Sequence, residues 1–511
     1  MLILLSDLHF VDGSAGNHNL PAAAYLKAFS TINIDLDDPP GSRERLVRKG
    51  VREIKIIFLG DIFDAVRSQN WFHRTCGVSA RIRPWGTNKS TTPTAQEVKK
   101  KFQMILAQMI DPDLLRQAGM DYPRLSTTPT ENVRNVWTVC RKLRDFKAAM
   151  KGSGLDIEYH YIPGNHDRFM NVDATCRRMA QLALDLDNNG PEGYPKLFTD
   201  PEYGLIGFHG HEVDRMNCGH GDLDDRHCDD SLYHEPSIGE AITIEIASRL
   251  VYETARRLRS RFPEERSVPK IIRIIENIDN VRPVKAIFPW LEFVARSTTL
   301  SKRLFTREVR DIMDNVVEDI CDDFAKIKFV RECSERIDQK FIPKSGNILV
   351  GLFSAFARVF DIDLHDSIKY INNMKSASAL MKMALVSEKT PRERTNELFE
   401  HKFNEEILEP VLAAFPDKRR RYYVYGHTHV PEVYPRQGRV FKDRRWRREE
   451  TVINTGTFRP RIIACGDQQG EEGFTEHKNI SFAVVYKKGE ISSRTGAEEC
   501  YEFWNAVLKS E

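Results

Sequence analysis

The chain has 511 residues, of which 41% are hydrophobic and 29% charged, and its formal net charge is only +2. This length predicts two or three domains, or one domain with large insertions, and the composition is typical of globular proteins. The small net charge excludes a strong overall attraction to nucleic acid or to a membrane surface, and leaves only local basic patches for such contacts. Nine cysteines without a CxxC pair favour a reducing compartment over a disulfide framework.

The apolar segments predict neither an export signal nor a membrane span. The first ten residues, MLILLSDLHF, have no basic start, and their apolar run is shorter than the ~7–15 residues of a signal core. The run 348–360 is shorter than the ~18–20 residues of a membrane helix and contains Arg358. It fits a buried helix or an interfacial one. We therefore expect a cytoplasmic protein without a transmembrane segment.

Five short apolar runs are typical of β-strands, and each of them ends in polar residues. In chain order they are MLILLSDLH (1–9), IKIIFLGDIFD (54–64), IEYHYIPGNHD (157–167), YGLIGFHGHEVD (203–214) and RYYVYGHTH (421–429). EETVINTGTF (449–458) and ISFAVVYKKGEI (480–491) predict two later strands. In open sheets with helical crossovers, ligand-binding loops gather at the carboxyl ends of the strands. We therefore expect the polar residues to meet there.

Helical patterns lie between these runs. They are clearest at 92–110, at 128–146 and at 306–327. Thr128 is the expected N-cap of the second helix, with Glu131 completing a capping box. The segment AITIEIASRL (241–250) fits strand alternation as well as helical spacing.

The uneven spacing of the strand-like runs predicts the domain organisation. We expect one core built from two parts of the chain, 1–235 and 401–511. A helical sub-insertion is expected at 68–150. A mainly helical insertion domain is expected at 236–400.

The polar residues at the predicted strand ends are carboxylates, imidazoles and one amide. In chain order they are Asp7, His9, Asp61, Asp64, Asn165, His166, Asp167, His209, His211, His427 and His429. This set suits divalent Mn, Fe or Zn. Residues two apart on a strand face the same side, so Asp7 and His9 are expected to chelate one ion. Seven ligands exceed one tetrahedral site and fit two ions about 3.5–4 Å apart that share a carboxylate.

The strings DLH, GDIFD, GNHD, HGHE and GHTH, in this order, resemble the five motifs of the calcineurin-like metallophosphoesterases. The resemblance covers residues 1–10, 53–67, 156–170, 203–214 and 420–457, and leaves out 68–150 and 236–400. It implies an α/β fold, a four-layer αββα metallophosphoesterase sandwich with a large, mainly helical insertion. It also implies a metal-dependent phosphoric ester hydrolase, in which a hydroxide activated by two metal ions attacks phosphorus.

The family pattern implies a role for each motif residue. The metal ligands would be Asp7, His9, Asp61 and His429 for the first ion, with Asp61 bridging to a second ion that Asn165, His209 and His427 complete. His166 would protonate the leaving group, as an imidazole with a pKa near 6.5 can do. His211 stays open as a replacement for His209 or as a substrate contact.

Four neighbours of these residues are expected to support the site. Asp64 and Asp167 would orient histidines or loops. Arg67 and Arg168 would bind phosphate, or else lie in solvent on a loop. The expected cofactors are two divalent metal ions, with manganese placed first and iron or zinc as alternatives.

The substrate is expected to be a phosphodiester, because a large helical insertion can build a substrate channel or cap. The alternatives are a nuclease acting on DNA or RNA, a nucleotide-sugar or lipid pyrophosphatase, and a phosphomonoesterase. A scaffold that has lost the chemistry is disfavoured, because every expected ligand is present.

Partners beyond the substrate are suggested by local segments. Basic runs at 255–262, 417–423 and 441–450 would bind a nucleic-acid backbone or form solvated faces. The segment 217–230, with two cysteines and two histidines, is a mobile loop or a structural zinc site. The 236–400 region offers a surface for oligomer formation.

Overall fold

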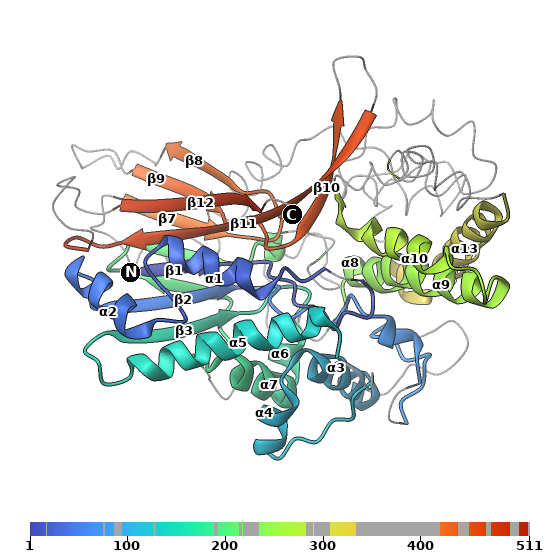
Figure 1. Cartoon of the computed structure of the whole chain (residues 1–511), viewed down its shortest axis with the longest axis horizontal. Helices are drawn as coiled ribbons and strands as arrows, with labels where there is room; N and C mark the ends of the chain where they lie inside the picture. The colour runs from blue at the N-terminus through green and yellow to red at the C-terminus, as the bar shows by residue number, and fades with distance from the viewer. Residues whose placement is uncertain are drawn as a thin grey trace.

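The computed structural model describes residues 1–16, 18–74, 77–85, 95–125, 129–188, 193–213, 217, 235–282, 290, 307–333, 420–437, 449–466, 472–490 and 500–508. The predictions for the apolar run 348–360, for 218–230 and for the basic run 441–448 fall outside these residues. The described chain forms two mixed β-sheets with helices beside them (Figure 1). The α/β class predicted from the sequence is confirmed.

The larger sheet has the strand order β3-β2-β1-β11-β10-β6, with β12 also pairing with β11. Three of its strands are parallel and adjacent: β1 (Leu2–Leu5), β2 (Glu53–Leu59) and β3 (Asp156–Ile162). The others are β6 (Val281–Arg282), β10 (Pro460–Gly466), β11 (Glu472–Tyr486) and β12 (Cys500–Leu508). β11 runs antiparallel to β1, β10 and β12.

The smaller sheet has the order β4-β5-β7-β9-β8. Its strands are β4 (Leu197–Asp200), β5 (Leu205–Phe208), β7 (Arg420–Tyr425), β8 (Glu432–Gln437) and β9 (Glu449–Asn454). β5, β7 and β9 are parallel neighbours, and β4 and β8 are antiparallel edge strands. All seven strands predicted from the sequence are confirmed, and they are divided between the two sheets.

The two sheets pack face to face, and helices cover the outer face of the larger one (Figure 1). Alternate residues of β1 pack into two different apolar clusters, because side chains on a strand alternate between its faces. Leu2 and Leu4 belong to the apolar cluster between the sheets, whereas Ile3 and Leu5 belong to the cluster under the helices. A strand buried on both faces explains the unbroken apolar run at the start of the sequence.

Helices from the first half of the chain form the outer layer. They are α1 (Ala22–Thr31), α2 (Pro39–Arg48), α3 (Ala95–Met109), α4 (Pro112–Gln117), α5 (Glu131–Met150), α6 (Phe169–Val172) and α7 (Ala174–Leu184). α5 starts at Glu131, and its N-cap is Thr130, whose side chain accepts a hydrogen bond from the Val133 amide. The prediction of Thr128 as the cap is wrong, because the helix begins two residues later and places Glu131 in its first position.

A second group of helices has its own apolar cluster. The group consists of α8 (Ile238–Ile242), a π-helical turn (Thr243–Ser248), α9 (Arg249–Arg261), α10 (Val268–Glu276) and α13 (Arg307–Lys326). Its apolar cluster is built mainly from α9, α10 and α13, and α8 does not contribute to it. Short 3₁₀ turns lie at Gln69–Phe72, His211–Val213 and Asn277–Asn280. The ambiguous segment 241–250 is therefore helical. Residues 334–419 are not described, so the predicted boundaries of the 236–400 insertion stay predictions. Among the described helices none has the length and apolar character needed to cross a membrane.

Candidate metal centre

Loops that follow five strands meet at one edge of the two sheets. In the larger sheet the Asp7 amide donates to the Gly60 carbonyl at 3.0 Å, so the loops after β1 and β2 run side by side. In the smaller sheet the Gly426 amide donates to the His209 carbonyl at 2.9 Å, which joins the loops after β5 and β7. The His427 amide donates to Asp7 Oδ2 at 2.9 Å and ties the two sheets together. The predicted gathering of polar strand ends is thus present.

The backbone of this edge is unusual. Seven non-glycine residues in the described chain have positive φ, and five of them are expected ligands: Asp7, His9, Asp61, His427 and His429. The prediction that Asp7 and His9 project from an extended strand is wrong, because β1 ends at Leu5 and both residues adopt left-handed conformations. Such conformations cost on the order of 1–3 kcal/mol each and cluster at functional sites. The surrounding hydrogen bonds must therefore hold them.

Three side chains form what we call the first donor group: Asp7, His9 and His429. The Nε2 atoms of His9 and His429 lie 2.9 Å apart. Asp7 Oδ1 is 3.1 Å from His429 Nε2 and 3.6 Å from His9 Nε2, and this buried oxygen accepts no well-formed hydrogen bond from the described residues. Two imidazole nitrogens and a carboxylate oxygen aimed at one point fit a divalent cation.

A second donor group contains Asp61, His209 and His427. Asp61 Oδ2 is 3.2 Å from His209 Nε2, and Asn165 Oδ1 is 3.3 Å from the same nitrogen. Asp61 Oδ2 is also 3.8 Å from His9 Nε2 in the first donor group. One carboxylate oxygen therefore faces both groups. All seven expected ligands lie in this one constellation.

Hydrogen bonds fix which ring nitrogen His9 and His166 offer. His9 Nδ1 is 2.8 Å from Asp64 Oδ2, and His166 Nδ1 is 2.9 Å from Asp64 Oδ1. Asp64 thereby uses both oxygens to orient two imidazoles, as outer carboxylates do in metal sites. Arg67 Nε lies 3.2 Å from Asp64 Oδ2, so Arg67 supports Asp64 within the loop. The His9 tautomer that results leaves Nε2 free for a cation.

The choice between His209 and His211 follows from the same kind of contact. His209 Nδ1 donates to the Leu59 carbonyl at 2.7 Å, which directs Nε2 toward Asp61. His211 is buried beside the site, with its ring 5.3 Å from that of His209, but it belongs to neither donor group. Burial lowers the pKa of His211 to about 4, so it is a neutral neighbour of the centre.

Asp167 and Arg168 hold the third motif in place. Asp167 accepts hydrogen bonds from the Ile62 amide at 2.8 Å, from the Gly164 amide at 2.5 Å and from the Tyr161 hydroxyl. Arg168 is buried and forms two hydrogen bonds with Glu240 of α8, at 2.8 Å and 3.2 Å. Its guanidinium is therefore bound to a carboxylate of the second helix group.

The electrostatics of the centre favour positive charge. Burial alone would raise the pKa of Asp7, yet the His429 and His9 imidazoles hold that pKa well below its usual range. Burial likewise opposes the ionised form of Asp61, and His209 overcomes it and lowers the pKa. Burial would lower the pKa of His209, but Asp61 raises it to about 10. Carboxylates that attract protons to their neighbours in this way also attract metal cations.

Two motif glycines leave room for these carboxylates. A Cβ at Gly164 would lie 2.2 Å from Asp61 Oδ1, and a Cβ at Gly426 would lie 2.3 Å from Asp7 Oδ2. Real Cβ atoms do not approach oxygen so closely, so any other residue would displace a carboxylate. This contact explains the glycine before Asn165 and the one before His427.

Sequence reasoning missed two supporting residues. Asn454 donates from Nδ2 to the Gly426 carbonyl at 3.2 Å and to Thr428 Oγ1 at 2.6 Å, so it orients the loop that carries His427 and His429. Its position at the end of a predicted strand was the available signal. Glu240, the partner of Arg168, lies in a helix that is distant from every motif along the sequence, so no pattern pointed to it.

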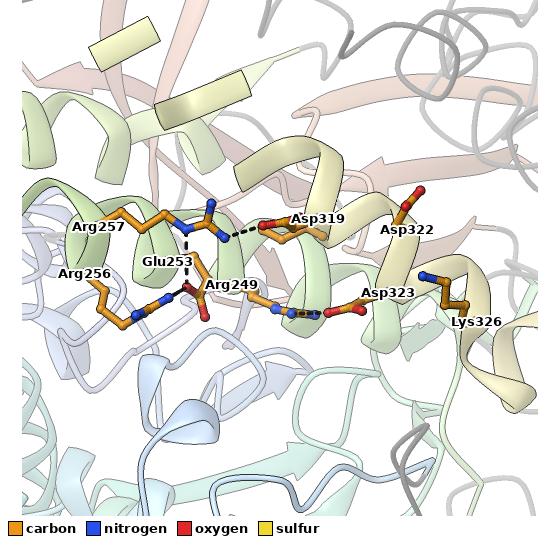
Figure 2. Close-up of a pocket in the computed structure, with 9 residues that line it drawn as sticks. Arg249, Glu253, Arg256, Arg257, Asp319, Asp322, Asp323 and Lys326 are labelled. Carbon is orange, nitrogen blue, oxygen red and sulfur yellow. Dashed lines mark hydrogen bonds and ion pairs between the residues drawn. The ribbon is translucent and has the colours of Figure 1, made fainter. Parts of the chain in front are cut away.

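A separate pocket of about 330 Å³ lies between α9 and α13 (Figure 2). Four basic and four acidic side chains line it, and several of them pair across it, as Arg257 does with Asp319 at 2.5 Å. None of the expected site residues contributes to its lining.

Comparisons of the chain with protein-family models, with curated proteins and with solved structures found no match. The chemical interpretation of the centre therefore depends on its own geometry and on the motifs.

Proposed function

We propose that the protein is a dinuclear metal-dependent phosphoesterase of the calcineurin-like type, with manganese as the expected metal. The observation that carries the proposal is the position of Asp61. Its Oδ2 atom lies within 4 Å of an imidazole Nε2 in each donor group. A carboxylate placed in this way suits a bridge between two cations. The four-layer sandwich belongs to the same proposal, since the described chain accounts for one helical layer and two sheets.

The donor atoms are suited to a phosphoester substrate. When bound, two adjacent divalent ions lower the pKa of water and neutralise charge on a phosphoryl group. The chain's own contribution is to hold seven ligand side chains together at one edge of the sheets, with five of them buried and His427 and His429 partly exposed. Asp7, Asp61 and Asp64 have at most 1% of their surface exposed, so water does not compete for their oxygens.

The contacts of His166 support a role as the general acid. Its amide donates to Asp61 Oδ1 at 2.8 Å, and its Nδ1 is bound to Asp64 Oδ1, which leaves Nε2 for the substrate. Burial would lower the pKa of His166, but Asp64 and Asp61 raise it above its ordinary value. An imidazole whose pKa is raised in this way suits transfer of a proton to a leaving oxygen.

Substrate leaving groups of different basicity test this role. We expect the Mn²⁺-loaded chain to hydrolyse bis-p-nitrophenyl phosphate, and His166→Asn to lower kcat on an alkyl diester such as TpT about 10²–10⁴-fold. The loss should be smaller for p-nitrophenolate, which leaves without protonation. His160→Asn, on β3 and bound to Glu158, is the control histidine variant and should retain activity.

A panel of substrates decides the substrate class. The diester, the monoester p-nitrophenyl phosphate, a pyrophosphate-linked nucleotide sugar, and single-stranded and duplex DNA are compared at equal metal loading. We expect the diester to be preferred over the monoester. A metal-loaded chain that hydrolyses none of them would contradict the proposed function.

A further inference from the structure

Arg461 lies beside the first donor group and has an unusual environment. It belongs to β10, and its Nη1 donates to the backbone carbonyl of His429 at 3.3 Å. Its Nε is buried and has no hydrogen-bond partner, although the side chain as a whole keeps some contact with solvent. Within the described ranges, that single carbonyl contact is the only hydrogen bond of its guanidinium, and no ion pair includes it.

Three buried arginines of the described chain, Arg67, Arg83 and Arg168, are paired with carboxylates. Arg83 lies 2.5 Å from Glu245, and Arg168 lies 2.8 Å from Glu240. Removing a guanidinium from water without a counter-charge is costly, which is why buried arginines are nearly always paired. The difference marks Arg461 as a cation whose partner is not a side chain of the described chain.

The position of Arg461 limits what that partner is. His429, whose carbonyl it contacts, also supplies Nε2 to the first donor group. Ile462, the next residue on β10, pairs with Val281 of β6, at the end of the second helix group. Arg461 therefore stands where the metal centre meets the helical region, beside a site that holds further positive charge once cations are bound. An anion is the species stabilised in such a place.

We propose that Arg461 forms an anion subsite that binds a phosphate oxygen of the substrate. The inference rests on the proposed phosphoesterase function and extends it to substrate recognition. A guanidinium suits this role because its planar N–H groups bind two phosphate oxygens at once. The oxygen belongs either to the phosphate that is cleaved or to a neighbouring phosphate of the same substrate, and both offer the same chemistry.

The test uses full-length, Mn²⁺-loaded Arg461→Gln and Arg461→Lys. Arg144→Gln is the matched control, because Arg144 is a half-buried arginine of α5 that also donates to a backbone carbonyl, at 2.7 Å to Ala183. We measure metal content, kcat/KM on p-nitrophenyl phosphate, TpT and pTpT, and inhibition by orthophosphate.

We expect Arg461→Gln to lower kcat/KM about 10- to 100-fold, mainly through KM, since charged hydrogen bonds are lost. Arg461→Lys should lose less, and Arg144→Gln should match the wild type. A loss on every substrate, with weaker orthophosphate inhibition, identifies the cleaved phosphate. If kcat/KM falls on pTpT but not on TpT, Arg461 binds a phosphate next to the cleaved one.

Unchanged kinetics and unchanged orthophosphate inhibition in metal-loaded Arg461→Gln would overturn the subsite and leave the phosphoesterase proposal intact. A wild-type chain without metal-dependent hydrolysis would instead overturn the proposed function. In that case orthophosphate binding to metal-loaded wild type and Arg461→Gln, measured by calorimetry, still tests the subsite, and equal affinities would overturn it.

Discussion

The candidate metal centre and the pocket between α9 and α13 are both rich in ionisable side chains, but their charges are arranged differently. In the pocket, basic and acidic groups are equal in number, and its three arginines pair with carboxylates near solvent (Figure 2). In the centre, three buried carboxylates face imidazoles on strained backbone, and Asp7 Oδ1 lacks a proper donor. Buried oxygen atoms without a hydrogen-bond partner indicate a bound ligand more reliably than a hollow whose charged side chains mostly pair with one another.

The largest loss of metal binding and activity is expected for replacement of Asp61. Asp61→Asn removes the oxygen that faces both donor groups, and we expect metal content to fall and phosphoesterase activity to drop to background. Asp319→Asn is the matched control, because it removes a carboxylate from the pocket. Metal analysis and bis-p-nitrophenyl phosphate assays check both variants. Equal activity in the two would remove the distinction between the regions.

The buried pair of Arg168 with Glu240 should stabilise the fold more than the exposed pair of Arg257 with Asp319 does. Glu240→Ala leaves the buried Arg168 without its carboxylate, and we expect a loss of about 3–5 kcal/mol in the free energy of unfolding. Urea denaturation measures it. Adding Arg168→Met to Glu240→Ala should recover part of the loss, because the unpaired charge is then absent. A loss below about 1 kcal/mol for Glu240→Ala would argue against a tightly buried pair.

Asp64 tests the importance of orientation in the centre. It binds no cation in our proposal but holds His9 and His166 through one oxygen each. Asp64→Asn should reduce metal affinity or activity about 10- to 100-fold, as loss of an outer carboxylate does in other metal sites. Metal titration and kcat measured at saturating Mn²⁺ separate the two effects. A wild-type profile in both would show that the histidines are held by other contacts.

The smallest effect is expected in the pocket. Arg257 and Asp319 pair at 2.5 Å, but their side chains are 28% and 59% exposed. Solvent screens such a pair, so Arg257→Gln should cost only about 0.2–1 kcal/mol and leave activity unchanged. Thermal unfolding and the diester assay check this expectation. A clear loss of activity would mean that the pocket takes part in function.

Much of the fold was predictable because its strands have simple patterns. Short apolar runs ending in polar residues correctly located β1, β2, β3, β5 and β7, and the polar ends meet as expected. The division of these strands between two sheets was not predictable, because each run looks alike in sequence. It depends on long-range pairings such as Leu4 with Ala483.

The residues of the centre could be predicted from the sequence, but their backbone conformations could not. The motifs named the seven donor residues, yet the positive φ angles of Asp7 and His9 depend on contacts with the β2 loop. The contact of His209 Nδ1 with the Leu59 carbonyl, which directs Nε2 toward Asp61, is revealed by no local pattern. Glu240 and Arg461 act through tertiary contacts alone, so sequence reasoning did not find them.

Titration of the metal-free chain with Mn²⁺, followed by calorimetry, tests the central claim most directly. We expect about two ions per chain for the wild type and for Asp319→Asn, and loss of binding when a ligand such as His209 or His429 is replaced by alanine. One ion or fewer per wild-type chain would contradict a dinuclear centre. So would a stoichiometry that survives both histidine replacements.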